Sequence, residues 1–145
     1  MLEIMIDKFI FCIPENLYYS QEGVWVALES TVARVGLSDF TQQLNGDVAF
    51  AHVMPVGTQV KTSERFSDIE TVKAILELPS PVTGRIVEIN PELENSAELI
   101  NQDPYGKGWM AVLELDRWEE EKSKLLDASQ YLELVKQQAE MEMKK

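Results

Sequence analysis

Short runs of alternating hydrophobic and polar residues follow one another along most of the chain, which is typical of β-strands with one buried face. Residues that favour turns separate these runs. The sequence therefore predicts antiparallel strands joined by hairpins over residues 24–28, 31–37, 48–53, 65–70, 74–78, 85–90 and 109–115. Before them, the apolar stretch from Phe9 to Ile13 predicts a first strand or an apolar flap on the core.

Helices are predicted where this strand pattern is interrupted. Ser38 or Asp39 can cap a short helix through residue 44, and Gly46 stands where helices usually end. Pro91 fits the first position of another helix, because proline there loses no needed hydrogen bond. A short helical or irregular passage is expected from there to residue 100.

The C-terminal part shows hydrophobic residues at helical spacing. Asp116 followed by Glu119 resembles a capping box, and the pattern predicts helices over about 117–126 and 128–140. Many short strands followed by a helical pair predict a mainly β fold, a β-sandwich or flattened barrel with short helices and C-terminal helices.

Length and composition are those of an ordinary globular protein. The 145 residues are 45% hydrophobic and 26% charged, which predicts one domain over 1–145, with a β core over about 24–115 and C-terminal helices over about 116–142. No apolar run of about eighteen residues predicts a membrane span. Acidic Glu3 and Asp7 precede the first apolar stretch, where a signal peptide would carry basic residues. The single cysteine cannot form an internal disulfide, so the fold does not depend on an oxidising compartment and we expect a cytoplasmic protein.

The charge balance and the few cysteines and histidines narrow the function. Thirteen basic and 25 acidic side chains give a net charge of −12, which disfavours nucleic acid and anionic membranes as partners. One cysteine and one histidine cannot build a disulfide or the usual zinc site, and we expect His52 to be structural or exposed. Asp39, Glu70 and Asp103 show no spacing that pairs them as acid and base, so catalysis is not expected.

A lysine occupies the centre of the predicted hairpin over residues 65–78. Lys73 lies where the chain should reverse, and we expect its side chain to extend into solvent. Phe66, Ile69 and either Ile75 or Leu76 are predicted to pack inward and to hold the base of the hairpin. An exposed lysine alone carries little functional information, because most lysines are solvated.

The residues around this lysine resemble a known motif. Glu70, Thr71, Val72, Lys73 and Ala74 are similar to the lipoylation motif of glycine cleavage system H proteins, in which lipoic acid is joined to the lysine amine. Lipoyl domains of 2-oxoacid dehydrogenases resemble the segment too, but typically have aspartate where Val72 stands. The resemblance extends in register from about residue 24 to 131, through the segments 36–42, 46–50, 80–84 and 99–109.

The resemblance implies a lipoyl carrier with a lipoyl-domain-like hybrid motif in its sandwich. Lipoic acid on Lys73 would shuttle an aminomethyl group from glycine decarboxylase to aminomethyltransferase, with reoxidation by dihydrolipoamide dehydrogenase. Glu70, Thr71, Val72 and Ala74 would form the segment that a lipoate ligase or transferase recognises. The carrier is expected to be a monomer and to have no catalytic residues of its own.

Two alternatives stay open. Gly23 and Val24 stand before Trp25 where the family has histidine and glutamate, and Leu44 replaces a histidine. These positions and the segment 13–19 resemble H-like lipoate-binding proteins, which carry sulfur for a heterodisulfide-reductase-like sulfur oxidation complex. The second alternative is a relative without lipoate that acts as a binding module. In each case Tyr18, Tyr19 and Trp25 are expected to pack on the sheet rather than to contact cargo.

Overall fold

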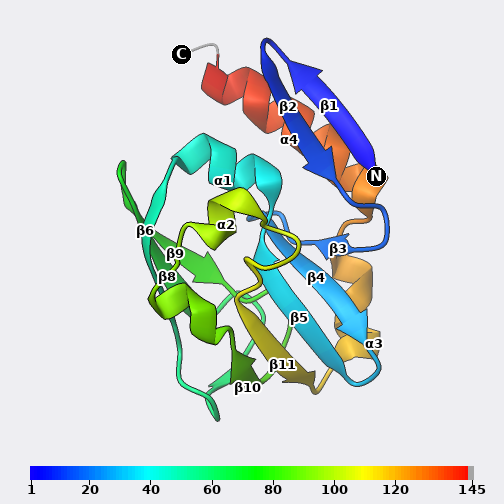
Figure 1. The fold of residues 1–145 in the computed structure, drawn as a ribbon. Coiled ribbons are helices and arrows are strands. Elements are labelled where there is room, and N and C mark those ends of the chain that lie inside the picture. Colours follow the sequence, from blue (N-terminus) through cyan, green and yellow to red (C-terminus); the bar gives the residue numbers. More distant parts are fainter. Residues whose placement is uncertain (144–145) are drawn as a thin grey trace.

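Two antiparallel sheets form the body of the molecule (Figure 1). The structure is a computed structural model and describes residues 1–143. The larger sheet has the strand order β3-β4-β5-β11-β10-β7, with the bounds Tyr18–Tyr19, Val24–Glu29, Val32–Leu37, Ala111–Leu115, Gly84–Ile89 and Gln59–Val60. The smaller sheet has the order β6-β8-β9, with the bounds Val48–Val53, Arg65–Thr71 and Ile75–Pro79. The predicted mainly β sandwich is therefore confirmed.

The main hydrophobic core lies between these sheets. Phe66 and Ile69 of β8 are fully buried, and so are Val35 of β5, Ile86 of β10 and Leu113 of β11. In β5, Ala33, Val35 and Leu37 face this core at the two-residue period that the sequence predicts. In β8 the register shifts between Arg65 and Ser67, so Phe66 and Ile69, three residues apart, both reach the core. A β-bulge between Ile86 and Glu88 shifts the register of β10 against β11.

A second hydrophobic cluster lies outside the sandwich, under an N-terminal hairpin (Figure 1). The hairpin consists of β1, Leu2–Ile6, and β2, Phe9–Ile13, and it packs against the C-terminal helix α4, Ala128–Met143. The rings of Tyr19 and Tyr131 stack in this cluster with centroids 4.4 Å apart. The strand at 9–13 is confirmed, but β1 was not predicted. Its residues alternate between half-buried and exposed, and none of them is fully buried.

The first helix follows its prediction. This helix, α1, spans Asp39–Asn45, and Ser38 caps it by accepting a hydrogen bond from the Thr41 N–H. Gly46 ends it with a φ of 82°, a left-handed value that favours glycine. Pro91 begins the short 3-10 helix η1, Pro91–Glu94, and α2, Leu99–Gln102, follows it.

The predicted capping box at the start of the C-terminal helices is wrong. Arg117 holds the cap position of α3, Trp118–Glu121, without a side-chain hydrogen bond. Asp116 instead accepts a hydrogen bond from the Gln59 side chain at 2.6 Å. The predicted helix over 117–126 is consequently split into α3 and a 3-10 turn, η2, Lys122–Lys124, whereas α4 extends to residue 143.

A buried carboxylate fastens α3 to the sandwich. Glu121 is 8% exposed and accepts hydrogen bonds from the Thr83 N–H at 2.8 Å and from the Thr62 hydroxyl at 2.6 Å. Burial by itself raises the pKa of this carboxyl, but the hydrogen bonds from Thr62 and Thr83 outweigh burial and leave the pKa below its ordinary value. The ionised form is thus the one that the fold stabilises.

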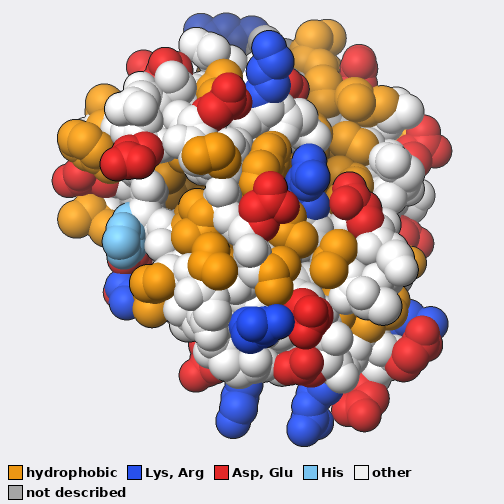
Figure 2. Space-filling view, turned by 60° about the horizontal axis from the view of Figure 1, so that its bottom comes forward, with side chains coloured by type: hydrophobic (Ala, Val, Ile, Leu, Met, Phe, Trp, Pro, Cys, Tyr) orange, Lys and Arg blue, Asp and Glu red, His pale blue; other side chains and the backbone are white. Residues whose placement is uncertain are grey.

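On the face shown in Figure 2, acidic, basic and hydrophobic side chains are intermixed. Every helix within residues 1–143 is too short or too polar to cross a membrane.

Candidate functional site

Lys73 lies in the tight turn that joins β8 to β9. The two strands remain paired up to Glu70 and Ile75, so only a few residues form the turn. The Thr71 N–H donates to the Ala74 carbonyl at 2.8 Å and closes it. The Lys73 side chain is exposed at the tip, as the sequence predicts.

The side chain of Thr71 organises the turn from inside. Its hydroxyl oxygen accepts hydrogen bonds from the N–H groups of Lys73 and Ala74, each at 3.1 Å, and the hydroxyl donates to the Ala74 carbonyl at 3.2 Å. Threonine and serine stabilise turns through such local bonds. Thr71 is 8% exposed, whereas Glu70, Val72, Lys73 and Ala74 are exposed. One motif residue therefore shapes the turn while the other four are presented to solvent.

The base of the hairpin is anchored in the main core. Phe66 and Ile69 are fully buried there, as predicted. Of the two alternatives offered for β9, Leu76 is the partly buried residue that packs against the core, and Ile75 is 68% exposed. In β9 it is therefore the side chain of Leu76 that points inward. Leu76 is paired with Ile69 of β8. A rigid base carries an exposed tip.

The end of α1 supports the turn from the side. The Val72 N–H donates to the Asp47 carbonyl at 3.2 Å, and the Lys73 Nζ donates to the Leu44 carbonyl at 3.2 Å. Asn101 holds this corner, because its amide donates to the Gly46 carbonyl at 3.0 Å and its oxygen accepts from the Val48 N–H at 2.8 Å. These contacts could not be predicted from the sequence, since backbone carbonyl groups accept most of them.

An apolar cavity of about 170 Å³ adjoins the lysine. It lies between the N-terminal hairpin and α1, and its lining consists of Phe9, Phe11, Phe40, Gln43, Leu44 and Lys73. Leu44, singled out in the sequence as the replacement of a histidine, is thus beside the lysine. Phe9 and Phe11 were missed as site residues, because nothing in the sequence connects residues 9–11 with residue 73.

Of the three aromatic residues expected to pack on the sheet, Tyr19 and Trp25 lie in the hydrophobic interior and Tyr18 is half-buried. Tyr19 and Trp25 are at most 1% exposed, and Tyr18 packs edge-on against Trp118. The Trp25 indole donates to the Pro104 carbonyl at 2.9 Å. Val24 is fully buried in the main core, so its position presents no side chain to solvent. The prediction that these aromatic residues pack on the sheet is confirmed.

Asp39 and Asp103, two of the three carboxylates considered as acid and base, stabilise the fold, and Glu70 is exposed. Asp39 accepts hydrogen bonds from the Cys12 N–H at 2.9 Å and from the Gln42 amide at 2.8 Å. Asp103 accepts from the Lys107 N–H at 2.8 Å within its own turn. His52 is exposed on β6, in agreement with its prediction. No cluster of three or more potential metal ligands occurs in the part of the chain that the structure describes.

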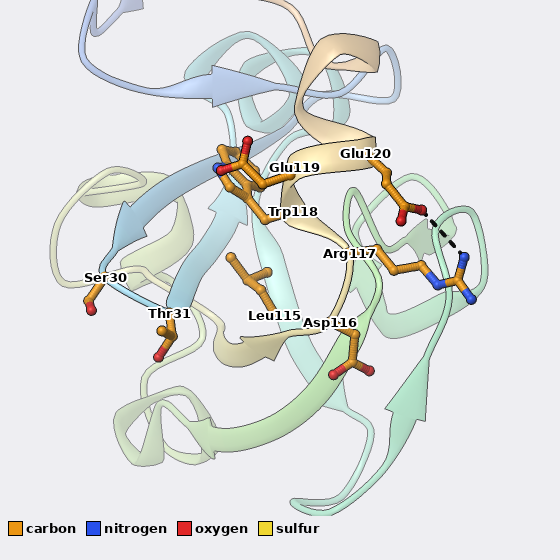
Figure 3. Close-up of a pocket in the computed structure, with 8 residues that line it drawn as sticks. All are labelled: Ser30, Thr31, Leu115, Asp116, Arg117, Trp118, Glu119 and Glu120. Carbon is orange, nitrogen blue, oxygen red and sulfur yellow. Dashed lines mark ion pairs between the residues drawn. The ribbon is translucent and has the colours of Figure 1, made fainter.

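A larger hollow of about 320 Å³ lies between the β4–β5 turn and α3 (Figure 3). Ser30 and Thr31 line one side, and Trp118 lines another. The ion pair between Arg117 and Glu120, at 3.5 Å, bounds it and is largely exposed. In Figure 1, α3 lies on the other side of the molecule from the β8–β9 hairpin, and no residue lines both this hollow and the cavity beside Lys73.

The fold and the site define a class of protein, a β-sandwich domain that exposes one lysine at the tip of a hairpin whose base lies in the core. The sequence comparisons place the chain more specifically. The family described as Glycine cleavage H-protein matches residues 17–138. The chain therefore belongs to the glycine cleavage H-protein family.

Individual relatives agree with this membership. The chain is 43% identical over 124 residues to the glycine cleavage system H protein of Brevibacillus brevis, covering 86% of this chain and 98% of the relative. It is 40% identical over 133 residues to the probable glycine cleavage system H protein of Pyrococcus abyssi, covering 91% and 98%. A crystal structure of a glycine cleavage system H protein from Mycobacterium marinum superposes with a TM-score of 0.76 at 28% identity, covering 83% of this chain and 97% of that one.

Proposed function

We propose that the protein is the lipoyl carrier of a glycine cleavage system and that Lys73 is the residue that bears the lipoyl group. The observation that carries the proposal is the position of Lys73, exposed at the tip of a hairpin whose base is fixed in the core. Family membership supplies the chemistry, since H proteins carry lipoate. When bound, the lipoyl group supplies a reversible disulfide that can take up an aminomethyl group and pass it on.

The residues present fit an amide-linked lipoyl group. Acylation of the lysine ammonium group removes two protons and the positive charge, and the amide nitrogen keeps one N–H. That N–H can continue to donate to the Leu44 carbonyl, which now accepts from Nζ at 3.2 Å. Lys73 takes part in none of the ion pairs within residues 1–143, so acylation breaks no ion pair there.

Recognition by a lipoate ligase or transferase would rest on the exposed residues of the turn. Glu70, Val72 and Ala74 are accessible to such an enzyme, and Val72 is 75% exposed. Thr71 would contribute by fixing the backbone in one shape, because its hydroxyl is occupied inside the turn. An enzyme that acylates one lysine among several can select it by this rigid, local shape.

The partners proposed for the loaded carrier are glycine decarboxylase, aminomethyltransferase and dihydrolipoamide dehydrogenase. The carrier would present the arm to each in turn and would have no catalytic residues itself. We expect it to act as a monomer in the cytoplasm. The sulfur-carrying alternative and the unlipoylated binding module are not favoured, because the family match and the relatives all point to glycine cleavage.

Replacement of the lysine tests the proposal directly. The protein is incubated with a lipoate ligase, lipoate and ATP, and its intact mass is measured. We expect the parent and the control Lys61→Arg, an exposed lysine elsewhere, to gain one lipoyl group, and Lys73→Arg to gain none. Lipoylated protein should then support exchange of labelled carbon dioxide into glycine by a glycine decarboxylase. Modification of Lys73→Arg at another lysine would overturn the site.

A further inference from the structure

The N-terminal hairpin has one covered edge, along β2. The Cys12 N–H donates to the Asp39 carboxylate of α1 at 2.9 Å, and the Cys12 carbonyl accepts from the Tyr105 hydroxyl at 2.8 Å. The Gln43 amide of α1 donates to the Ile10 carbonyl at 2.9 Å. Cys12 and Ile10 therefore turn backbone polar groups away from β1, toward side chains that cover this edge.

The opposite edge of the hairpin, along β1, is open. In an antiparallel pair, residues that bond to each other alternate with residues whose N–H and carbonyl groups point outward. Glu3 is paired with Cys12, and Met5 is paired in the same way with Ile10, so the backbone groups of both also point outward. No hydrogen bond within residues 1–143 reaches these groups, because β1 pairs with β2 alone. In Figure 1, β1 lies on the side of the hairpin away from α1.

The side chains of β1 suit an added strand. Leu2, Ile4 and Ile6 are half-buried on the face that packs toward α4, and a further strand would cover more of their apolar surface. β1 also lacks proline and lysine, which natural proteins use to block an exposed edge. The unpaired edge is thus a template for an extended segment of another chain.

The charge on β1 indicates what kind of segment fits. Glu3 is exposed and takes part in none of the ion pairs within residues 1–143. Opposite charges on neighbouring strands stabilise their pairing, whereas like charges directly opposite each other destabilise it. A lysine or arginine across from Glu3 is therefore favoured. The net charge of −12 opposes a second copy of this chain and favours a basic partner.

We propose that the free edge of β1 is a docking site for an extended, basic segment of an enzyme that the lipoyl arm visits. The identity of the partner rests on the proposed function. The segment adds to β1 as a strand, with apolar side chains beside Leu2 and Ile4 and a lysine or arginine opposite Glu3. The hairpin residues that line the cavity beside Lys73 belong to β2 alone. The docked enzyme therefore holds the carrier while the lysine stays accessible, which raises the effective concentration of the arm.

The test measures amide hydrogen exchange at Glu3 and Met5, residue by residue, in the full-length, lipoylated protein. The protein is measured alone and with each of three purified enzymes of the same organism: glycine decarboxylase, aminomethyltransferase and dihydrolipoamide dehydrogenase. The dissociation constant for each enzyme is measured in parallel.

Two variants change the edge in different ways. Met5→Pro removes an N–H that points away from β2, so the pairing with β2 keeps its hydrogen bonds. Its control is Met5→Ala, which shortens the side chain and keeps the N–H. Glu3→Lys reverses the charge on the edge, and Glu29→Lys makes the same change at an exposed residue outside the hairpin. Unfolding midpoints show whether each variant is folded, and Glu3→Lys decides if Met5→Pro is not.

With one of the three enzymes bound, we expect exchange at Glu3 and Met5 to slow at least about tenfold, because their N–H groups become donors. Met5→Pro and Glu3→Lys should each raise the dissociation constant for that enzyme at least about fivefold. Met5→Ala and Glu29→Lys should change it less than about twofold. Equal dissociation constants for Glu3→Lys and Glu29→Lys would contradict the proposed match of charge.

The other outcomes separate this inference from the proposed function. Unchanged exchange at Glu3 and Met5 with all three enzymes, in a lipoylated protein that still supports exchange of labelled carbon dioxide into glycine, would overturn the docking site alone. Slow exchange in the protein by itself, together with the mass of a dimer, would assign the edge to a second copy and overturn the docking site too. A parent that gains no lipoyl group would overturn the proposed function. Strand addition to β1 can still be measured then, because it needs no lipoyl group.

Discussion

The chemistry of the site depends on how one side chain shapes the backbone on either side of Lys73. The Thr71 hydroxyl uses all of its hydrogen-bonding capacity within four residues of chain. It accepts hydrogen bonds from the N–H groups of Lys73 and Ala74 and donates one to the Ala74 carbonyl. The backbone that carries Lys73 is thereby held in one conformation. Specificity for this lysine would follow from that fixed presentation.

Removal of the Thr71 hydroxyl should loosen the turn without unfolding the protein. Thr71→Val is expected to lower the free energy of unfolding by about 1 kcal/mol, since two backbone N–H groups lose their acceptor. The initial rate of enzymatic lipoylation is expected to fall by about threefold to tenfold, because Lys73 is presented less regularly. Thr71→Ser keeps the hydroxyl and should retain the parental rate. Equal rates in Thr71→Val and the parent would show that the ligase does not need this turn geometry.

Sequence reasoning located the lysine but not its surroundings. Lys73 could be predicted as exposed because turn residues and two apolar runs bracket it, and the adjacent motif resembles a known one. The hydrogen bond from Lys73 to Leu44 could not be predicted, since its acceptor is a backbone carbonyl that any residue would provide. Phe9 and Phe11 reach the site only because a separate hairpin folds over α1, which no local pattern encodes.

At the scale of elements, the β8–β9 hairpin combines a buried base with an exposed tip. Phe66 and Ile69 fix β8 in the main core, and β9 contributes Leu78, which is 3% exposed. Near the tip, Ile75 and Val72 are left exposed although both are hydrophobic. The buried residues stabilise the fold, and the exposed ones remain free to contact an enzyme that approaches Lys73.

Truncation of residues at the two ends of this hairpin should separate stability from recognition. Phe66→Ala is expected to lower the free energy of unfolding by about 3 to 5 kcal/mol, because it leaves a cavity in the main core. Ile75→Ala, at a site 68% exposed, should change it by no more than about 0.5 kcal/mol. Denaturant unfolding measures both. A large loss in Ile75→Ala would mean that β9 has the opposite phase in solution.

The elements that the sequence predicted well are those with complete local signals. For α1, Ser38 and Gly46 stand at its two ends and both act as expected. The capping box failed because Asp116 has a competing partner, the Gln59 side chain, which lies far away in the sequence. β1 was not predicted, because only one of its faces is covered. That face packs against α4, and this contact depends on the tertiary fold.

At the scale of the whole molecule, the C-terminal helix is connected to the lysine site through a chain of contacts. Tyr131 of α4 stacks on Tyr19, and its hydroxyl lies 2.6 Å from the hydroxyl of Ser38, the cap of α1. The far end of α1 provides the Leu44 carbonyl beside Lys73. The second hydrophobic cluster therefore positions α1, and α1 in turn forms one side of the site.

Tyrosine ionisation offers a measure of how firmly this cluster is closed. Burial raises the pKa of the Tyr131 hydroxyl above its ordinary value of 10.0, and the nearby Asp39 carboxylate adds to the effect, although hydrogen bonds with Ser38 and Thr41 oppose it. Folded Tyr131 therefore stays protonated at a pH where the unfolded chain ionises. The stability that Tyr131 contributes is complete below pH 10 and is lost as the pH rises above that value.

Tyr131→Phe should consequently affect stability most at neutral pH and least in alkali. At pH 7 we expect its free energy of unfolding to be about 1 kcal/mol below that of the parent, because the hydroxyl contact with Ser38 is gone. Above about pH 10 Tyr131 ionises in the unfolded parent, which lowers the parent's free energy of unfolding. The variant has no hydroxyl to ionise at this position, so the difference in free energy of unfolding between the two proteins should narrow or reverse. Denaturant unfolding at a series of pH values measures this difference. If the free energies of unfolding of the parent and the variant differ by the same amount up to about pH 11, the Tyr131 hydroxyl would be open to solvent. The contact between α4 and the cap of α1 would then not be closed in solution.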